Sequence, residues 1–229
     1  MEELETQITK AKCQKGPGKS GVTPEAYKVM PMESKTILLK IVCNVYKGRT
    51  DPDEWHEALA KCLHKKGDTS DPNNWRATCL KDMRARLMSG IMNARLIQVI
   101  HEHGVKTQHG SQPGLGYLDG LYTLRSGLAT RRYHNQPTWA LFVDLVKAFD
   151  TVNHALLFKL LERYGVPKDV ARVVKRMYEG MFVKLKVGKE ERCISYTVGI
   201  QQSDNMAPLL FFFPMQAFGE ILEKKWIDE

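Results

Sequence analysis

The run from Trp139 to Val146 constrains the fold more than any other part of the sequence. It is short and apolar apart from Asp144, and it lies between Pro137 and a helical pattern that starts at Lys147. A short apolar run between such boundaries is typical of a buried strand. A buried strand followed directly by a helix predicts a mixed α/β (α+β) chain.

Several further elements are predicted after this run. Apolar residues recur at helical spacing from Val152 to Leu161, and a second helix continues through Ala171–Met177. Residues 183–198 alternate between apolar and polar on both sides of a glycine, which predicts a β-hairpin. A strongly apolar helix is expected from about Ala207.

The first half of the chain is predicted to be mainly helical. Residues 10–20 are rich in Lys, Gly and Pro and predict an extended loop, and two helices are expected between Thr23 and Val42. Residues 55–63 also predict a helix, followed by a turn-rich connection over residues 65–74 between two extended segments. Residues 81–103 predict a long amphipathic helix with a basic face.

The charge of the chain favours a polyanionic partner. Its 229 residues carry a formal net charge of +8, and the sequence pI is about 9.2. Nucleic acid is the expected partner, because each Lys or Arg that neutralises a phosphate releases condensed counterions. Mild basicity that serves only solubility is the alternative.

The cysteine pattern and the apolar runs limit the class of protein. The five cysteines are scattered without a Cys-x-x-Cys pair, which disfavours structural zinc and implies a reducing, intracellular compartment, either nucleus or cytoplasm. The longest apolar run, Met206–Phe213, is too short to span a bilayer, so no membrane is expected.

Asp144 is the first candidate for chemistry. A carboxylate at the mouth of a buried strand is costly unless it binds a cation, meets a hydrogen-bond donor or reaches solvent. A helix N-cap is the alternative role for an Asp at this position. The string Phe-Val-Asp-Leu-Val-Lys-Ala-Phe-Asp-Thr-Val, residues 142–152, resembles motif A of reverse transcriptases of the non-LTR (LINE-type) retrotransposon kind.

This resemblance implies roles for three residues. Asp144 would coordinate two divalent metal ions, Mg²⁺ or Mn²⁺, and the backbone carbonyl of Leu145 would help to hold one of them. Phe149 would be the steric gate against a ribonucleotide 2′-hydroxyl. Nucleotidyl transfer places negative charge on the attacking oxygen, the reacting phosphate and the leaving pyrophosphate, and two metal ions neutralise all three.

A second segment, residues 199–211, resembles motif B of the same family, a Gly-x-x-Gln-Gly-Asp turn before an apolar helix. Gln202 would contact the incoming nucleotide, and Pro208 would open the helix. Ser203 stands where the family carries glycine, at a position expected to lie against the template. A polar turn that caps a core helix would explain the same residues without a function.

The third match is the turn Lys65-Lys-Gly-Asp68 followed by Asn74-Trp-Arg76, which resembles the fingers hairpin of this family. By this resemblance, Lys65 or Lys66 and Arg76 would grip the triphosphate of the incoming dNTP. Arg offers a fork for bidentate phosphate contacts and Lys a movable point charge. Taken alone, such a turn is more often a solvated loop.

The segment Gly16-Pro-Gly-Lys-Ser-Gly-Val-Thr-Pro24 resembles the N-terminal motif of LINE-type enzymes. Gly18 and Lys19 would then lie along the template RNA. A phosphate-binding P-loop is disfavoured, because no strand precedes the Gly-Lys-Ser triplet and the first glycine of that motif is missing.

Together these matches imply a right-hand polymerase fold with fingers over residues 1–137, an incomplete palm over residues 138–229 and no thumb. The implied partners are an RNA template, a DNA primer and dNTP. The family's Asp-Asp hairpin is absent, since no Asp-Asp pair occurs in the sequence. We therefore expect a chain truncated before that motif and inactive as a polymerase alone.

Two alternatives stay open at this stage. Residues 108–114 resemble a family loop that reads Gln-x-Gly-Phe, with Ser111 in place of the aromatic residue. Ser111, Ser203 and Pro214, which lies inside the predicted apolar helix, favour a decayed remnant that binds nucleic acid without catalysis. A group II intron maturase or a telomerase-like enzyme shares motif A, but the Lys-Ala-Phe-Asp-Thr-Val form favours the LINE-type group. The oligomeric state is not indicated by the sequence.

Overall fold

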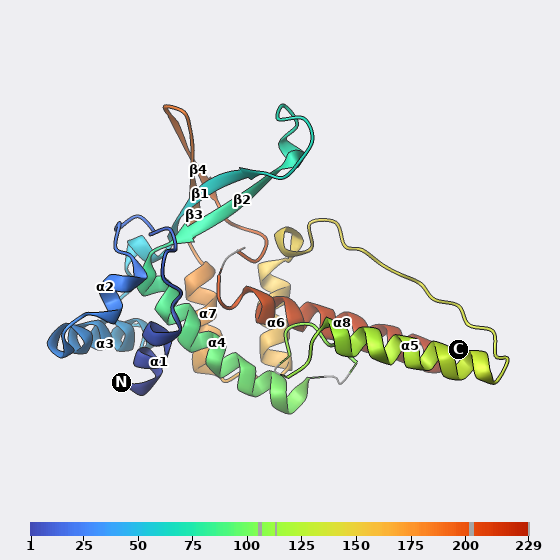
Figure 1. Ribbon diagram of the computed structural model, residues 1–229. Helices are drawn as coiled ribbons and strands as arrows, with labels where there is room; N and C mark the ends of the chain where they lie inside the picture. The colour runs from blue at the N-terminus through green and yellow to red at the C-terminus, as the bar shows by residue number, and fades with distance from the viewer. Residues whose placement is uncertain (105–106, 113, 202–203, 229) are drawn as a thin grey trace.

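The computed structural model describes residues 1–104, 107–112, 114–201 and 204–228, with side chains up to residue 225. The mixed α/β class predicted from the sequence is confirmed (Figure 1). The elements in chain order are α1 Glu2–Lys10, α2 Pro24–Lys28, α3 Met32–Tyr46, η1 Asp53–Trp55, β1 Glu57–His64, η2 Pro72–Asn74, β2 Trp75–Lys81, α4 Met83–His103, α5 Tyr117–Tyr133, η3 Ala148–Thr151, α6 His154–Arg163, α7 Lys168–Tyr178, β3 Phe182–Val187, β4 Glu190–Ser195 and α8 Ala207–Asp228.

The strands form one sheet in the order β2-β1-β3-β4. Two antiparallel hairpins, β1–β2 and β3–β4, are joined by parallel pairing of β1 with β3, where Ala58 lies opposite Val183. The hairpin predicted over residues 183–198 is thereby confirmed. Both hairpin tips project away from the helices (Figure 1), so the sheet meets the core only at its base.

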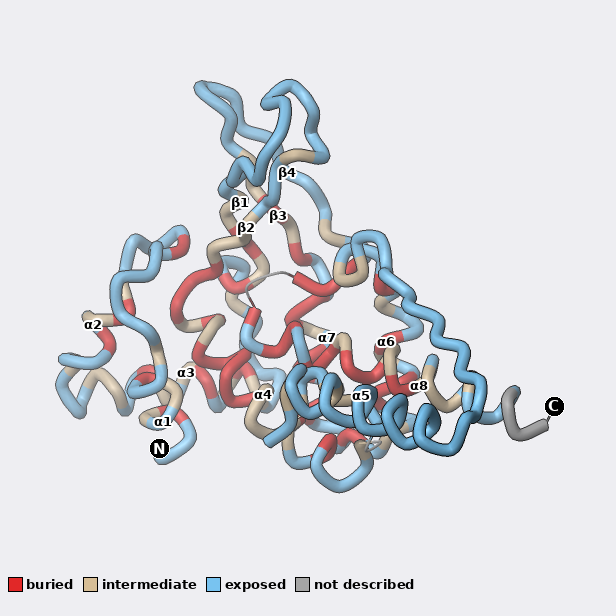
Figure 2. The backbone as a smooth tube through the Cα atoms, turned by 45° about the vertical axis from the view of Figure 1, so that its right-hand side comes forward, coloured by how far each residue is buried: buried red, intermediate tan, exposed pale blue. Residues whose placement is uncertain are grey.

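The core is built around α4. Buried side chains occur on all sides of this helix, from Met83 through Met88 and Met92 to Ile100. The six consecutive residues Leu87–Met92 are all buried, so the middle of α4 is covered on every face, and α1, α7 and α8 pack against the helix. Figure 2 shows the buried stretches concentrated where these helices meet. No helix in the described part of the chain is both long and apolar enough to cross a membrane.

Two elements differ from the sequence prediction in the first half. Residues 57–64 form strand β1 where a helix was predicted, and only Asp53–Trp55 takes a helical turn. The pairing of β1 with β2 on one side and β3 on the other accounts for this difference, since strand pairing depends on partners elsewhere in the chain. Helix α1 was not predicted; Leu4 and Ile8 are buried on its inner face.

The strand predicted over Trp139–Val146 is wrong. These residues have no regular secondary structure and are all exposed, with Trp139 at 97% and Phe142 at 79% relative exposure. The four strands of the sheet come from other segments, so this run has no strand partner in the described part of the chain. Helix α5, which precedes it, has no buried residue, and both lie outside the core in Figure 2.

Candidate functional site

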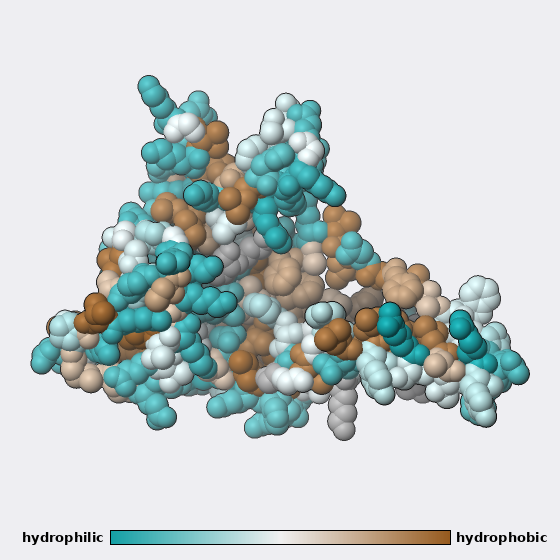
Figure 3. All heavy atoms as spheres, in the orientation of Figure 1, coloured by the Kyte–Doolittle hydropathy of each residue, from teal (hydrophilic) through white to brown (hydrophobic). Residues whose placement is uncertain are grey.

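A cavity of about 570 Å³ lies between the β1–β2 hairpin and the turn that leads into α6. Figure 3 shows hydrophilic side chains on the hairpin tips and more hydrophobic ones in the hollow below. The cavity is lined by Lys65, Pro72, Asn73, Trp75, Arg76, Ala77, Cys79, Lys147, Ala148, Phe149, Asp150 and Tyr196. It therefore brings two of the predicted triphosphate-binding residues next to the predicted steric gate.

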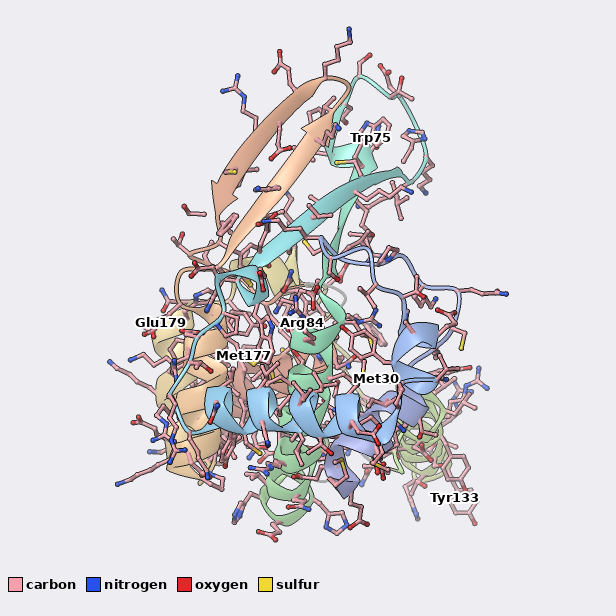
Figure 4. The ribbon with its side chains drawn as sticks, turned by 90° about the vertical axis from the view of Figure 1, so that its left-hand side faces the viewer. Met30, Trp75, Arg84, Tyr133, Met177 and Glu179 are labelled. Atoms are coloured by element: carbon pink, nitrogen blue, oxygen red, sulfur yellow. The ribbon has the colours of Figure 1, made fainter. Side chains whose placement is uncertain are left out.

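The hairpin tip is held in shape by its own hydrogen bonds. The Lys65 amide donates to the Asn74 carbonyl at 2.8 Å, which closes the ten-residue connection at its base. The Trp75 ring lies against His64, with centroids 5.1 Å apart, and its Nε1 donates to the Thr69 carbonyl at 2.9 Å. Trp75 marks this tip in Figure 4. The cavity wall is thus a fixed feature of the hairpin.

Backbone hydrogen bonds join the motif A turn to the start of motif B. The Ile200 amide donates to the Phe149 carbonyl at 2.7 Å, and the Gly199 amide donates to the Val152 carbonyl at 2.8 Å. His154 Nε2 lies 2.7 Å from the Gly199 carbonyl oxygen. These contacts fix the half-buried Phe149 at the cavity floor.

The charges around the cavity favour an anionic ligand. Three cations line it, Lys65, Arg76 and Lys147, against one carboxylate, Asp150. Burial raises the pKa of the Tyr196 phenol, and the nearby charges of Cys79 and Asp150 raise it further, so this hydroxyl is neutral at physiological pH. A polyphosphate carries the charge that such a lining attracts.

The predicted metal ligands do not line this cavity. Asp144 is exposed on the irregular segment before η3, and Leu145 beside it is 45% exposed. Asp144 does not cap a helix either, because the N-cap of α6 is Asn153, whose side chain accepts from the Leu156 amide. Among the described residues no group of three His, Cys, Asp or Glu could hold a metal ion. The described donors therefore do not fit a complete divalent metal site.

The remaining predicted residues fall in three places. Lys66 is exposed at the hairpin tip and is not part of the cavity lining. Gly18 is buried, and Lys19 Nζ lies 2.7 Å from Glu57 Oε2, an ion pair within the protein. Gln202 and Ser203 lie outside the described residues.

A second, basic cavity was not foreseen from the motifs. It measures about 410 Å³ and lies between α1, the residues after it and α4. Its cationic lining residues, Lys10, Lys12, Lys15 and Arg86, form no ion pair within the described part of the chain, and no carboxylate lines the cavity. The Lys-rich composition of residues 10–20 is the sequence signal that could have indicated it.

Two curated proteins are similar to this chain over most of its length. The retrovirus-related Pol polyprotein from type-1 retrotransposable element R2 of Popillia japonica is 25% identical over 85% of this chain and 27% of its own length. The transposon TX1 uncharacterized 149 kDa protein of Xenopus laevis is 23% identical over 98% of this chain and 17% of its own length. The chain thus spans less than a third of either relative.

A solved structure titled "Partial Cas6-RT-Cas1--Cas2 complex" aligns with a TM-score of 0.46 and 13% identity, over 97% of this chain and 34% of that chain. The family model described as "Reverse transcriptase (RNA-dependent DNA polymerase)" matches residues 63–228, which include the β1–β2 connection, β2, the β3–β4 hairpin and both motifs around the larger cavity. The chain belongs to the reverse transcriptase family, and its curated relatives are retrotransposon proteins.

Proposed function

We propose that this chain holds the incoming dNTP of a retrotransposon reverse transcriptase. Lys65 and Arg76 would grip the triphosphate, and Phe149 would lie against the sugar as the steric gate. The single observation that carries this proposal is the shared cavity, in which the hairpin cations face the motif A turn.

The residue types suit a triphosphate. The Arg76 guanidinium offers paired N–H donors for two phosphate oxygens, while Lys65 and Lys147 supply point charges. Charge-assisted hydrogen bonds of this kind contribute about 1.5–3 kcal/mol each, which corresponds to about 10- to 150-fold in affinity. Lys66, outside the cavity lining, is assigned no part in this contact.

The basic cavity beside α1 supports a nucleic-acid partner. Four cations that form no ion pair with any described carboxylate line it together with the amide side chains of Gln7, Asn93 and Asn205. Phosphate oxygens of an RNA template would replace the missing carboxylates, and amides can donate to the same oxygens. Template contact is accordingly proposed for this cavity in addition to the loop around Gly18 and Lys19.

Catalysis is proposed to need more than the 229 residues of this sequence. Mg²⁺ or Mn²⁺ would supply charge neutralisation at the reacting phosphate, and Asp144 with the Leu145 carbonyl would be this chain's ligands. Because the described donors do not complete such a site, primer extension by these residues alone is not expected. Incorporation of dNTP that disappears in Asp144→Ala would contradict this.

Equilibrium binding of a fluorescent dNTP to the purified chain tests the nucleotide proposal. Lys65→Ala and Arg76→Ala should each weaken binding about 10-fold or more, whereas Lys66→Ala, one residue along the same tip, should change it less than about 2-fold. Equal effects of Lys65→Ala and Lys66→Ala would show general charge attraction instead of a cavity contact.

A non-catalytic nucleic-acid-binding remnant is the second candidate, favoured by the exposed position of Asp144 and by the basic cavity. It predicts tight RNA binding without dNTP binding. Replacing Lys10, Lys12 and Lys15 by Ala should then lower the slope of log K against log salt by about 1 for each phosphate that is no longer neutralised. Saturable dNTP binding that depends on Arg76 decides for the first candidate.

A further inference from the structure

Lys81, the last residue of β2, and Asp82, the N-cap of α4, form a buried junction that is contacted by distant parts of the chain. Their relative exposures are 4% and 2%, although both carry charge. Buried charges are costly unless they are paired and hydrogen-bonded. Their partners come from opposite ends of the sequence.

Lys81 reaches the motif B turn. Its Nζ lies 2.9 Å from Asp204 Oδ2, with both side chains almost fully buried, and it lies 5.8 Å from the Tyr178 ring centroid. Asp204 also shapes the turn itself, because its Oδ1 accepts from the Met206 amide at 3.2 Å and its carbonyl accepts from the Ala207 amide at 3.2 Å. The start of α8 is thus attached to the end of β2.

The N-terminal loop, residues 11–23, packs against the backbone at Asp82. A Cβ placed on Gly18 would lie 2.5 Å from the Asp82 nitrogen and 2.5 Å from the Lys81 carbonyl carbon, so the two backbones touch. Next to this contact, Lys19 pairs with Glu57 at the start of β1. Asp82 accepts from both the amide and Nε of Arg84, which lies at the first turn of α4 (Figure 4).

We propose that the Lys81–Asp82 junction positions the motif B turn, and that the N-terminal loop contributes by fixing this junction from the other side. Lys81, Asp204 and Gly18 are then positioning residues for the larger cavity, whose wall continues along β2 through Arg76 and Cys79. The link to nucleotide binding rests on the proposed function, but the positioning itself does not.

A buried ion pair contributes little net stability, because desolvation offsets most of the attraction, and an apolar pair of similar size is often neutral or stabilising. The double variant Lys81→Met/Asp204→Leu therefore removes the contact that positions the motif B turn without a large expected change in the stability of the chain. Hydrogen exchange at Met206 and Ala207, whose amides bond to Asp204, should become at least about 10-fold faster while the denaturant midpoint stays near that of the parent chain. Fluorescent dNTP binding should weaken about 10-fold.

Gly18→Ala tests the contribution of the N-terminal loop, and Gly16→Ala in the same loop is its control. The added Cβ has ordinary contact with Leu80 at 3.5 Å in Gly16→Ala but meets backbone at 2.5 Å in Gly18→Ala. Gly18→Ala alone should therefore speed exchange at Met206 and Ala207. Unchanged exchange there in both Gly18→Ala and the double variant would overturn the proposal. If the parent chain binds no dNTP, the proposed function fails, and the exchange rates still decide the positioning.

Discussion

The ring of Phe149, the predicted steric gate, stacks on the ring of Phe211 in α8, with centroids 4.7 Å apart and planes inclined by 23°. This stacking restricts how far the Phe149 ring can turn toward the cavity. The motif A turn is therefore supported from the motif B helix by a side chain, in addition to the backbone bonds of Gly199 and Ile200.

The stacked pair should be energetically coupled. Phe211→Ala should lower the free energy of unfolding by about 2 kcal/mol, since the ring is half-buried. In a double-mutant cycle with Phe149→Ala, urea unfolding should give a coupling energy of about 1 kcal/mol. Phe218→Ala, on the same helix at 44% relative exposure, should change the free energy of unfolding by less than about 0.5 kcal/mol. Additive effects of the stacked pair would show that the rings merely lie close together.

Gly199 should tolerate no side chain. Its φ is +92°, and an added Cβ would lie 2.8 Å from the Asp150 carbonyl oxygen, so Gly199→Ala combines backbone strain with a steric clash. We expect Gly199→Ala to lower the free energy of unfolding by about 3 kcal/mol, measured by thermal or urea unfolding. Gly188→Ala, at φ +63° with open space around it, should lose only about 1 kcal/mol. Equal losses in the two variants would argue against the close approach of motifs A and B.

Local patterns predicted much of the fold and part of the cavity. The alternation of residues 183–198 gave β3 and β4 correctly, and the turn signals of residues 65–74 gave the connection that places Lys65 and Arg76 together. The order of the motifs led to the family that the comparison bears out. Each of these features depends on residues that are neighbours in the chain, and it could therefore be predicted from the sequence.

Elements that depend on distant partners were not reached. Strand β1 lies between β2 and β3, and its pairing with β3 joins residues far apart in the sequence. The run Trp139–Val146 has the composition of a buried strand, yet it remains exposed because pairing needs a neighbouring strand as well as suitable residues. The ion pair between Lys81 and Asp204 has no local signal either, because a basic residue at a strand end is ordinary.

Acid should weaken the tie between Lys81 and Asp204. Burial raises the pKa of the Asp204 carboxyl, but the charge and hydrogen bond of Lys81 outweigh this and hold the pKa below its usual value. Because the folded pKa is depressed, the stabilisation is present above the unfolded pKa of about 3.9 and is lost as pH falls through the folded value.

Urea unfolding at stepped pH measures this effect. Asp204→Asn should be less stable than the parent chain by about 3–5 kcal/mol at pH 7, since it leaves the Lys81 charge buried without its partner. This difference in the free energy of unfolding should become smaller below about pH 3.9. Glu223→Gln, at an exposed position near the end of α8, should have almost the same free energy of unfolding as the parent chain at every pH. If the difference in free energy of unfolding between Asp204→Asn and the parent chain stays constant at acidic pH, the carboxylate charge is not what stabilises the turn.

The exposed run Trp139–Val146 should drive self-association of this chain. Trp139 and Phe142 are largely exposed, and contiguous apolar surface of this kind marks an interaction site or an aggregation liability. Trp139→Ser/Phe142→Ser should lower the fluorescence of a bound apolar dye about 2-fold or more and shift sedimentation toward the monomer, with little change in unfolding. Val29→Ser removes a single apolar side chain of 82% relative exposure at the end of α2, so it should alter neither measurement. An undiminished dye signal in the double variant would place the associating surface elsewhere, with the exposed leucines and tyrosines of α5 next to be replaced.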